Sequence, residues 1–221
     1  DVSGHPNVQY HLPADLLPYG ITVKLGYAPN TADGDSNSFK STGGANSQGP
    51  DGNGAQQIRV DAAPIDGLKL AADYIDYTGT SGSASQQEKT GGNISVQYAM
   101  GNFKVGVMEG YTEDGVGSYA DGDGSSFDRQ ETSIMGIEFA INDNLTVSYQ
   151  EEEHKAVDVG TIAVGATTKA KKTTTLESEI AQIAYNIGGA TVGVFVNETE
   201  NSDFTVGKKE KKTIFHLGME F

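Results

Sequence analysis

Short segments of alternating apolar and polar residues recur along the whole chain, and this alternation constrains the fold more than any other feature. The C-terminal stretch TIFHLGMEF shows it clearly, because Phe215, Leu217, Met219 and Phe221 alternate with polar or small residues. A period of two places successive side chains on opposite faces of a β-strand. Helical periodicity is not convincing anywhere, including residues 174–187, so the sequence predicts an all-β protein.

Eleven such segments are predicted as strands, and the connections between them alternate strictly between short and long. Glycine and asparagine in the short connections suit the positive-φ positions of tight hairpin turns. Alternating short turns and long polar loops predict an antiparallel up-and-down β-barrel. The short connections are Asp66-Gly67, Gly101-Asn102, Asn142-Asp143-Asn144 and Gly188-Gly189, and the long ones are 30–54, 78–90, 114–127, 156–172 and 201–210. The predicted strands are 7–12, 20–29, 55–65, 68–77, 91–100, 103–112, 130–141, 145–155, 174–187, 190–200 and 211–221.

A soluble β-sandwich and a membrane barrel both alternate in this way, because each has one apolar sheet face. Two observations favour the barrel over a soluble or surface-exposed β-sandwich adhesin. The strands approach the roughly nine to eleven residues that cross a membrane, and aromatic residues gather in two bands that match the girdles of membrane barrels. The bands are Tyr19, Tyr98, Phe103, Phe139 and Tyr185 beside the short turns, and Tyr27, Tyr74, Tyr111 and Tyr149 toward the long loops.

Composition excludes several classes of protein. The net charge of −15 argues against a nucleic-acid partner, which requires a basic surface. The absence of cysteine excludes a disulfide scaffold and thiolate metal sites. No stretch approaches the roughly 18 continuous apolar residues of a membrane helix, and the mean hydropathy is −0.40. No cofactor is predicted.

The whole chain resembles Gram-negative outer-membrane general diffusion porins, which are sixteen-stranded trimeric barrels, and two stretches carry the resemblance most clearly. They are the C-terminal strand and the segment NVQYHLPADLLPYGITVKLGY, residues 7–27, which resembles a porin strand–turn–strand hairpin. The resemblance implies an outer-membrane location, short periplasmic turns, long extracellular loops and a passive channel rather than an enzyme. It implies as partners the lipid bilayer, lipopolysaccharide, further copies of the chain in a trimer and small hydrophilic solutes. It also implies that Phe215, Leu217, Met219 and Phe221 carry a signal read by the barrel-assembly machinery.

The odd number of strands leads to a further expectation. Bacterial single-chain barrels have an even number of strands with both termini on the short-turn side, whereas here the first segment begins on the long-loop side. We therefore expect residues 1–221 to form the C-terminal part of one sixteen-stranded barrel domain, with residues 1–6 as the tail of the preceding loop. The first strand, residues 8–12, and the end of the last, residues 216–221, are then not neighbours.

The polar faces of the predicted strands supply the candidate functional residues. Charges of both signs around a water-filled lumen create a transverse field that orients dipolar solutes, although the same charges could merely solvate a polar lumen. Arg59 is the leading candidate, as the only arginine in a predicted strand, and acidic loops predict a weak cation preference. The predicted pore-lining residues are Lys24, Arg59, Asp61, Lys69, Asp73, Lys104, Glu138, Glu152, Lys212 and Glu220.

Other motifs carry competing interpretations. The histidines His5, His11, His154 and His216 raise the possibility of an outer-membrane hydrolase, but no Ser/His or Asp/His pair stands out at strand ends, and His154 has the surroundings of a solvated strand end. Residues 32–38 and 121–124 are rich in oxygen ligands without complete calcium-loop spacing, so no metal site is predicted and Asp121 and Asp123 are only calcium candidates. The lysines Lys208, Lys209, Lys211 and Lys212 could pair with lipopolysaccharide phosphates or form a charged rim.

Overall fold

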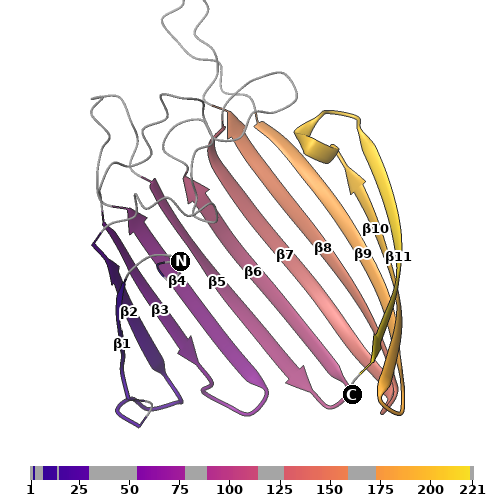
Figure 1. The fold of residues 1–221 in the computed structure, drawn as a ribbon, viewed down its shortest axis with the longest axis horizontal. Helices are drawn as coiled ribbons and strands as arrows, with labels where there is room; N and C mark the ends of the chain where they lie inside the picture. The colour runs from indigo at the N-terminus through magenta and orange to yellow at the C-terminus, as the bar shows by residue number, and fades with distance from the viewer. Residues whose placement is uncertain are drawn as a thin grey trace, which may run out of the picture.

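The computed structural model describes residue 2 and residues 7–13, 15–29, 54–77, 89–113, 127–158 and 173–219. These residues form one antiparallel sheet of eleven strands, in which each strand pairs with its neighbours in sequence (Figure 1). The predicted all-β, up-and-down arrangement is therefore confirmed. The strands are β1 (Val8–His11), β2 (Thr22–Ala28), β3 (Ala55–Ala62), β4 (Leu68–Tyr77), β5 (Lys89–Met100), β6 (Phe103–Glu113), β7 (Phe127–Asn142), β8 (Leu145–Asp158), β9 (Thr173–Ile187), β10 (Ala190–Glu200) and β11 (Lys209–Met219). Among these residues there is no α-helix of the length and apolarity needed to cross a bilayer.

Tight turns join the strands at one end of the sheet, shown at the bottom of Figure 1. Gly188 and Gly189 both have positive φ, at 49° and 95°. Gly67 has a φ of 78°, and a Cβ atom there would lie 2.1 Å from the carbonyl oxygen of Ala99. Only glycine adopts this conformation without a side-chain penalty, so these turns require the residues that the sequence places there.

Several strands extend further toward the loop end than the sequence predicts, β7 and β8 by the most. β7 begins at Phe127 rather than residue 130, and β8 continues to Asp158 rather than residue 155. Arg129 pairs in register with Glu113 of β6 and Val157 of β8. Cross-strand pairing therefore continues into a stretch whose polar composition is typical of a loop.

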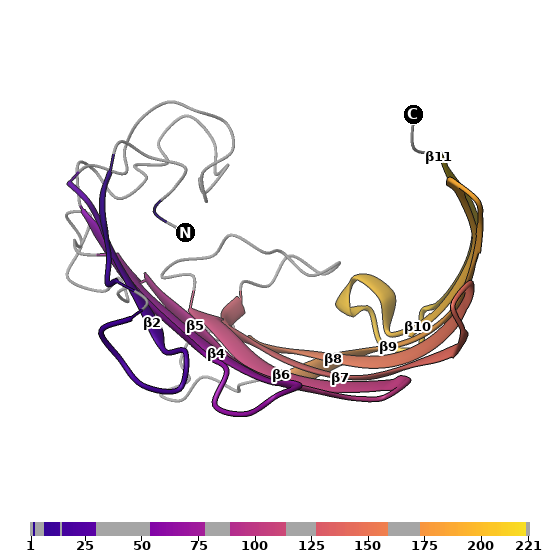
Figure 2. The same cartoon turned by 90° about the horizontal axis from the view of Figure 1, so that it is seen from below.

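The sheet curves into an open trough, seen along its length in Figure 2. β1 and β11 form the two edges and do not pair with each other in the part of the chain that the structure describes. The expectation that the first and last strands are not neighbours is therefore confirmed. The N-terminal end lies on the concave side of the trough (Figure 2).

The convex face carries the apolar residues of the strands and has no second layer covering it. Phe215 on β11 is 79% exposed and Leu217 is 63% exposed. The buried hydrophobic residues of the described chain are few: Val2, Ala28, Ala55, Tyr77 and Ala156. A contiguous exposed apolar surface marks a contact with a membrane or another protein. A single sheet does not match the sandwich alternative, which needs two packed sheets.

On β4 and on β6 to β11 the convex face changes from apolar to charged toward the loop end, and the border between the two zones runs obliquely. On β8 the uninterrupted run of convex apolar residues, Leu145, Val147 and Tyr149, ends at Tyr149, before Glu151. The register row through Tyr149 passes through Ile137, Val105 and Tyr98 and reaches Leu68 on β4. On β4, convex apolar residues continue six residues beyond this row, to Tyr74. The apolar zone is therefore a continuous band whose edge crosses the strands at an angle.

Candidate functional site

The position of Val2 identifies which side chains face the concave side. Its backbone N–H donates a hydrogen bond to Oε1 of Gln57 at 3.1 Å, and its side chain packs against Ala28, Ala55 and Tyr77. A Cβ atom on Gly26 would lie 2.6 Å from Cγ2 of Val2. Because side chains alternate along a strand, every second residue from these positions also faces the concave side.

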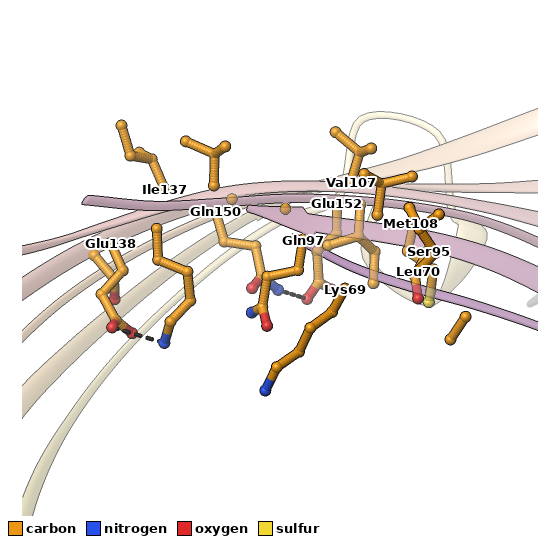
Figure 3. A pocket seen from close by; sticks show the side chains of 18 of the residues that line it. Lys69, Leu70, Ser95, Gln97, Val107, Met108, Ile137, Glu138, Gln150 and Glu152 are labelled. Atoms are coloured by element: carbon orange, nitrogen blue, oxygen red, sulfur yellow. Dashed lines mark hydrogen bonds and ion pairs between the residues drawn. The ribbon is translucent and has the colours of Figure 1, made fainter. Parts of the chain in front are cut away.

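Nine of the ten predicted pore-lining residues lie in the described chain, and all nine share the concave face; Glu220 lies outside the described residues. Figure 3 shows Lys69 and Glu138 on one side of the sheet, with Val107 and Ile137 on the other. Their role in lining a pore stays a prediction. Six of the nine line a hollow of about 960 Å³ on this face: Arg59, Asp61, Lys69, Lys104, Glu138 and Glu152.

Charged residues on β2, β3 and β4 lie side by side in one register row. Lys24 pairs in register with Arg59, and Arg59 with Asp73. The Arg59 guanidinium donates to Asp61 from Nη2 at 2.8 Å and from Nε at 3.0 Å. The Asn93 side-chain amide donates to both carboxylate oxygens of Asp73 at 3.0 Å. These contacts hold charges of both signs at defined positions on the wall.

Further along the trough most charges are also paired. Nζ of Lys104 donates to Oε1 of Glu138 at 2.8 Å, across directly paired positions of β6 and β7. The Gln150 amide donates to Glu152 at 2.5 Å. Nζ of Lys212 lies 3.0 Å from Oε1 of Glu210. The side chains of Lys24 and Lys69 are the exceptions, since neither makes a hydrogen bond or ion pair with any residue that the structure describes; of the two, only Lys69 lines the hollow.

Uncharged residues of the hollow were not among the sequence predictions, although the same alternation would have found them. They lie at the same alternate strand positions as the predicted charges and therefore share the concave face, but they carry no charge that would mark them as candidates. These additional lining residues are Ser95, Gln97, Met108, Ile134, Ser148, Gln150, Gln182 and Phe195. The prediction that Arg59 is the only strand arginine is wrong, because the extended β7 includes Arg129, which ion-pairs with Glu131 on the convex face.

Six glutamates form two register rows on the charged zone of the convex face. One row is Glu151, Glu179 and Glu198, ending on Lys211. The other is Glu153, Glu177 and Glu200, ending on Lys209. Each lysine pairs with the adjacent glutamate of β10. Like charges directly opposite one another on adjacent strands are destabilising. The glutamates in the middle of the two rows, Glu179 and Glu177, are therefore repelled by the glutamates on both sides.

We expect Glu179→Gln to stabilise the protein, because both residues that pair with Glu179 in register, Glu151 and Glu198, are glutamates. The expected gain is roughly 0.2–1 kcal/mol, measured by urea unfolding from lipid vesicles in dilute salt. Glu198→Gln is the control, since it also breaks the contact with Lys211 and should gain less. The gain should shrink at about 1 M salt, where the Debye length falls to roughly 3 Å; a loss of stability in Glu179→Gln would contradict the repulsion.

The four lysines at the start of the last strand are compensated within the chain. Lys208 pairs with Asp203, Lys209 with Glu200, Lys211 with Glu198 and Lys212 with Glu210. The first of these pairs closes the connection between β10 and β11, which contains a short 3₁₀ turn at Ser202–Phe204. The cluster is therefore an ion-paired rim rather than a concentration of free positive charge.

The Asp203–Lys208 pair predicts a pH response in this connection. The hydrogen bond from Lys208 lowers the pKa of Asp203. A lowered pKa means that the pair stabilises the loop above the unfolded value of about 3.9 and that this contribution is lost as pH falls through the folded pKa. Carboxyl NMR should show a midpoint for Asp203 below about 3.9, and Lys208→Gln should move it upward; an unchanged midpoint in that variant would refute the pairing.

The remaining sequence candidates have mixed outcomes. His154 is not a solvated strand end, because it is half-buried on the concave face, where Nδ1 lies 3.1 Å from Oγ1 of Thr132 and Nε2 lies 3.3 Å from Glu152. In the described chain no three acidic, histidine or cysteine side chains form a metal-binding group. Asp121, Asp123 and Phe221 lie outside the described residues, while Phe215, Leu217 and Met219 lie on the convex face.

Comparison with known proteins agrees with this geometry at the level of the fold. No protein-family model matches the chain, and no curated protein matches it in sequence. Among solved structures, it is similar to Salmonella typhi OmpF in complex with daunomycin, with a TM-score of 0.64 and 11% sequence identity. The match covers 96% of this chain and 60% of the OmpF chain. The curved, eleven-stranded antiparallel sheet therefore has the fold of the wall of a porin barrel.

Proposed function

We propose that this protein contributes the wall of a water-filled channel in the bacterial outer membrane, through which ions and small hydrophilic solutes diffuse passively. The observation that carries the proposal is the contrast between the two faces of one sheet. The convex face is an uncovered apolar band, and the concave face holds fixed charges around a hollow of about 960 Å³. A lipid-facing band opposite a polar lumen is the arrangement of a porin.

The concave residues predicted from the sequence would line this channel. Positive and negative side chains on the described wall are balanced in number. The five basic residues are Lys24, Arg59, Lys69, Lys104 and Lys212, and the five acidic residues are Asp61, Asp73, Glu138, Glu152 and Glu210. The whole chain nevertheless carries a net charge of −15. Excess carboxylates near a channel mouth concentrate cations within a Debye length, so the proposed channel weakly prefers cations.

Several further properties belong to the same proposal. A trimer, recognition of the C-terminal strand by the barrel-assembly machinery and contact with lipopolysaccharide would accompany a porin of this fold. Because the four lysines of the ion-paired rim already have carboxylate partners, lipopolysaccharide contact through them would require these pairs to open. The proposed role is not enzymatic, and hydrolytic assays on peptides and phospholipids test the alternative.

Single-channel recording in a planar bilayer is the decisive experiment. The purified protein should produce discrete conductance steps, and a salt gradient should give a small reversal potential of the sign expected for cation preference. That potential should decline as salt is raised, because screening weakens the field of the acidic groups. Absence of conductance, together with solubility in the absence of detergent, would reject the channel and favour the adhesin alternative.

A further inference from the structure

Two neighbouring glycines in the middle of the concave wall leave a patch of backbone that no side chain of their own covers. Gly106 on β6 and Gly136 on β7 are directly paired in register, with Gln97 beside one and Gln150 beside the other. A Cβ atom at either position would have no neighbour closer than 3.6 Å. Neither glycine has positive φ, so neither the backbone nor steric crowding requires glycine here. We call Gly106 and Gly136 the glycine floor.

A glycine inside a strand weakens it, because it costs entropy and supplies no packing side chain, and it often marks a place where a ligand approaches the backbone closely. Gln97 and Gln150 are separated by three strand spacings, which is roughly 14 Å between their Cα atoms. Their side chains project from the same face of the sheet on either side of the floor, as Figure 3 shows.

The polar side chains around the glycine floor are largely uncommitted. Within the described chain, no hydrogen bond or ion pair involves the side chains of Ser95, Gln97, Ser148 or Gln182, all of which line the hollow. Amide and hydroxyl groups of this kind can each both donate and accept. The nearby wall therefore offers several free hydrogen-bonding groups to a solute that carries hydroxyls.

One uncompensated charge stands beside these groups. Lys69 on β4 pairs in register with Gln97, and its ammonium group projects from the wall without a partner among the described residues (Figure 3). The other charges at the hollow are engaged: Arg59 with Asp61, Lys104 with Glu138, and Glu152 with Gln150 and His154. The free charge at this position is therefore positive, which selects an anionic group on the solute.

We propose that the glycine floor is a binding subsite for small hydroxylated carboxylates, the chemical class of sugar acids. The carboxylate binds the Lys69 ammonium, the hydroxyls hydrogen-bond to Gln97, Gln150 and the neighbouring serines, and the body of the solute lies over Gly106 and Gly136. The inference rests on the proposed channel, because the subsite is reached from its lumen. Binding slows such a solute locally and makes it a blocker of the ionic current.

The test is current block in the protein reconstituted in a planar bilayer, with gluconate, glucose and glucosamine as probes in dilute KCl. Gluconate should interrupt the current at lower concentration than either neutral glucose or cationic glucosamine. Lys69→Met should raise the half-blocking concentration of gluconate about tenfold, the loss expected for one charge-assisted hydrogen bond. Lys69→Arg should preserve the block, and Lys211→Met on the convex face is the control for net charge.

A second variant tests the floor itself. Gly136→Val places a side chain over the floor, at a position where an added Cβ atom has no neighbour closer than 3.6 Å. It should therefore weaken gluconate block while the protein keeps its heat-modifiable migration. If the unmodified protein forms no channels, the proposed function is rejected. If it forms channels that gluconate blocks no better than glucose does, only the subsite is rejected. Equal weakening in Lys69→Met and Lys211→Met would also overturn it, since the effect would then be general screening.

Discussion

Val147→Arg should destabilise the folded protein in lipid by about 2–4 kcal/mol, the cost of an arginine on the lipid face near the bilayer midplane. Val147 is the middle convex residue of the apolar part of β8, between Leu145 and Tyr149. It pairs in register with Phe139 on β7 and Ile183 on β9, so its surroundings are apolar on both sides. Equilibrium unfolding by urea from phospholipid vesicles, scored by heat-modifiable migration, measures the loss.

Ser148→Arg is the matched control for this substitution. Ser148 is the next residue on the same strand, faces the concave side and lines the hollow, where water hydrates the added charge. Its cost should be below about 1 kcal/mol. If the two substitutions cost the same, the convex face does not contact hydrocarbon and the membrane arrangement is wrong.

Arg59→Glu should raise the preference for cations several-fold in dilute salt. The substitution changes the wall by two unit charges and places a third carboxylate beside Asp61 and Asp73. At roughly 7 Å in water, a monovalent ion interacts with each unit of wall charge by about 0.6 kcal/mol. Two units therefore correspond to about a sevenfold change in the preference for cations, before ionic screening reduces it. The reversal potential across a salt gradient measures the change.

Arg129→Glu makes the same charge change on the opposite face of the sheet. Arg129 lies on the convex side, ion-paired with Glu131, and the sheet separates it from the proposed lumen. The reversal potential of Arg129→Glu should stay close to that of the unmodified protein, and so should the reversal potential of Arg59→Lys. Equal shifts in Arg59→Glu and Arg129→Glu would mean that the concave wall does not set selectivity.

Strand positions were predictable where a tight turn lies beside a strictly alternating segment. The bounds of β4 and β10 match the predicted 68–77 and 190–200. The extension of β7 was not predictable, because a stretch of charged residues such as Asp128 and Arg129 has the composition of a loop. Only the register with β6 and β8 shows that these residues continue the ladder.

The sequence predicted the sheet face on which a side chain lies better than it predicted the partner that the side chain contacts. Alternation assigned Lys69 and Lys104 to the same face, but only the register places Glu138 opposite Lys104 and leaves Lys69 beside Gln97. The facing of Glu151, Glu179 and Glu198 was hidden for the same reason, since it depends on the alignment of three strands. Periodicity identifies a face, whereas pairing depends on the turns and bulges that set the register.

The oblique border of the convex apolar zone gives the angle at which the strands cross the bilayer. Between β8 and β4 the border moves six residues along the strand from the register row of Tyr149, to Tyr74. Six residues rise roughly 20 Å, and the four strand spacings between these strands cover roughly 19 Å sideways. A membrane surface that is level along this border therefore requires strands tilted by roughly 45° from the membrane normal. That value falls at the upper end of the roughly 35–45° of outer-membrane barrels.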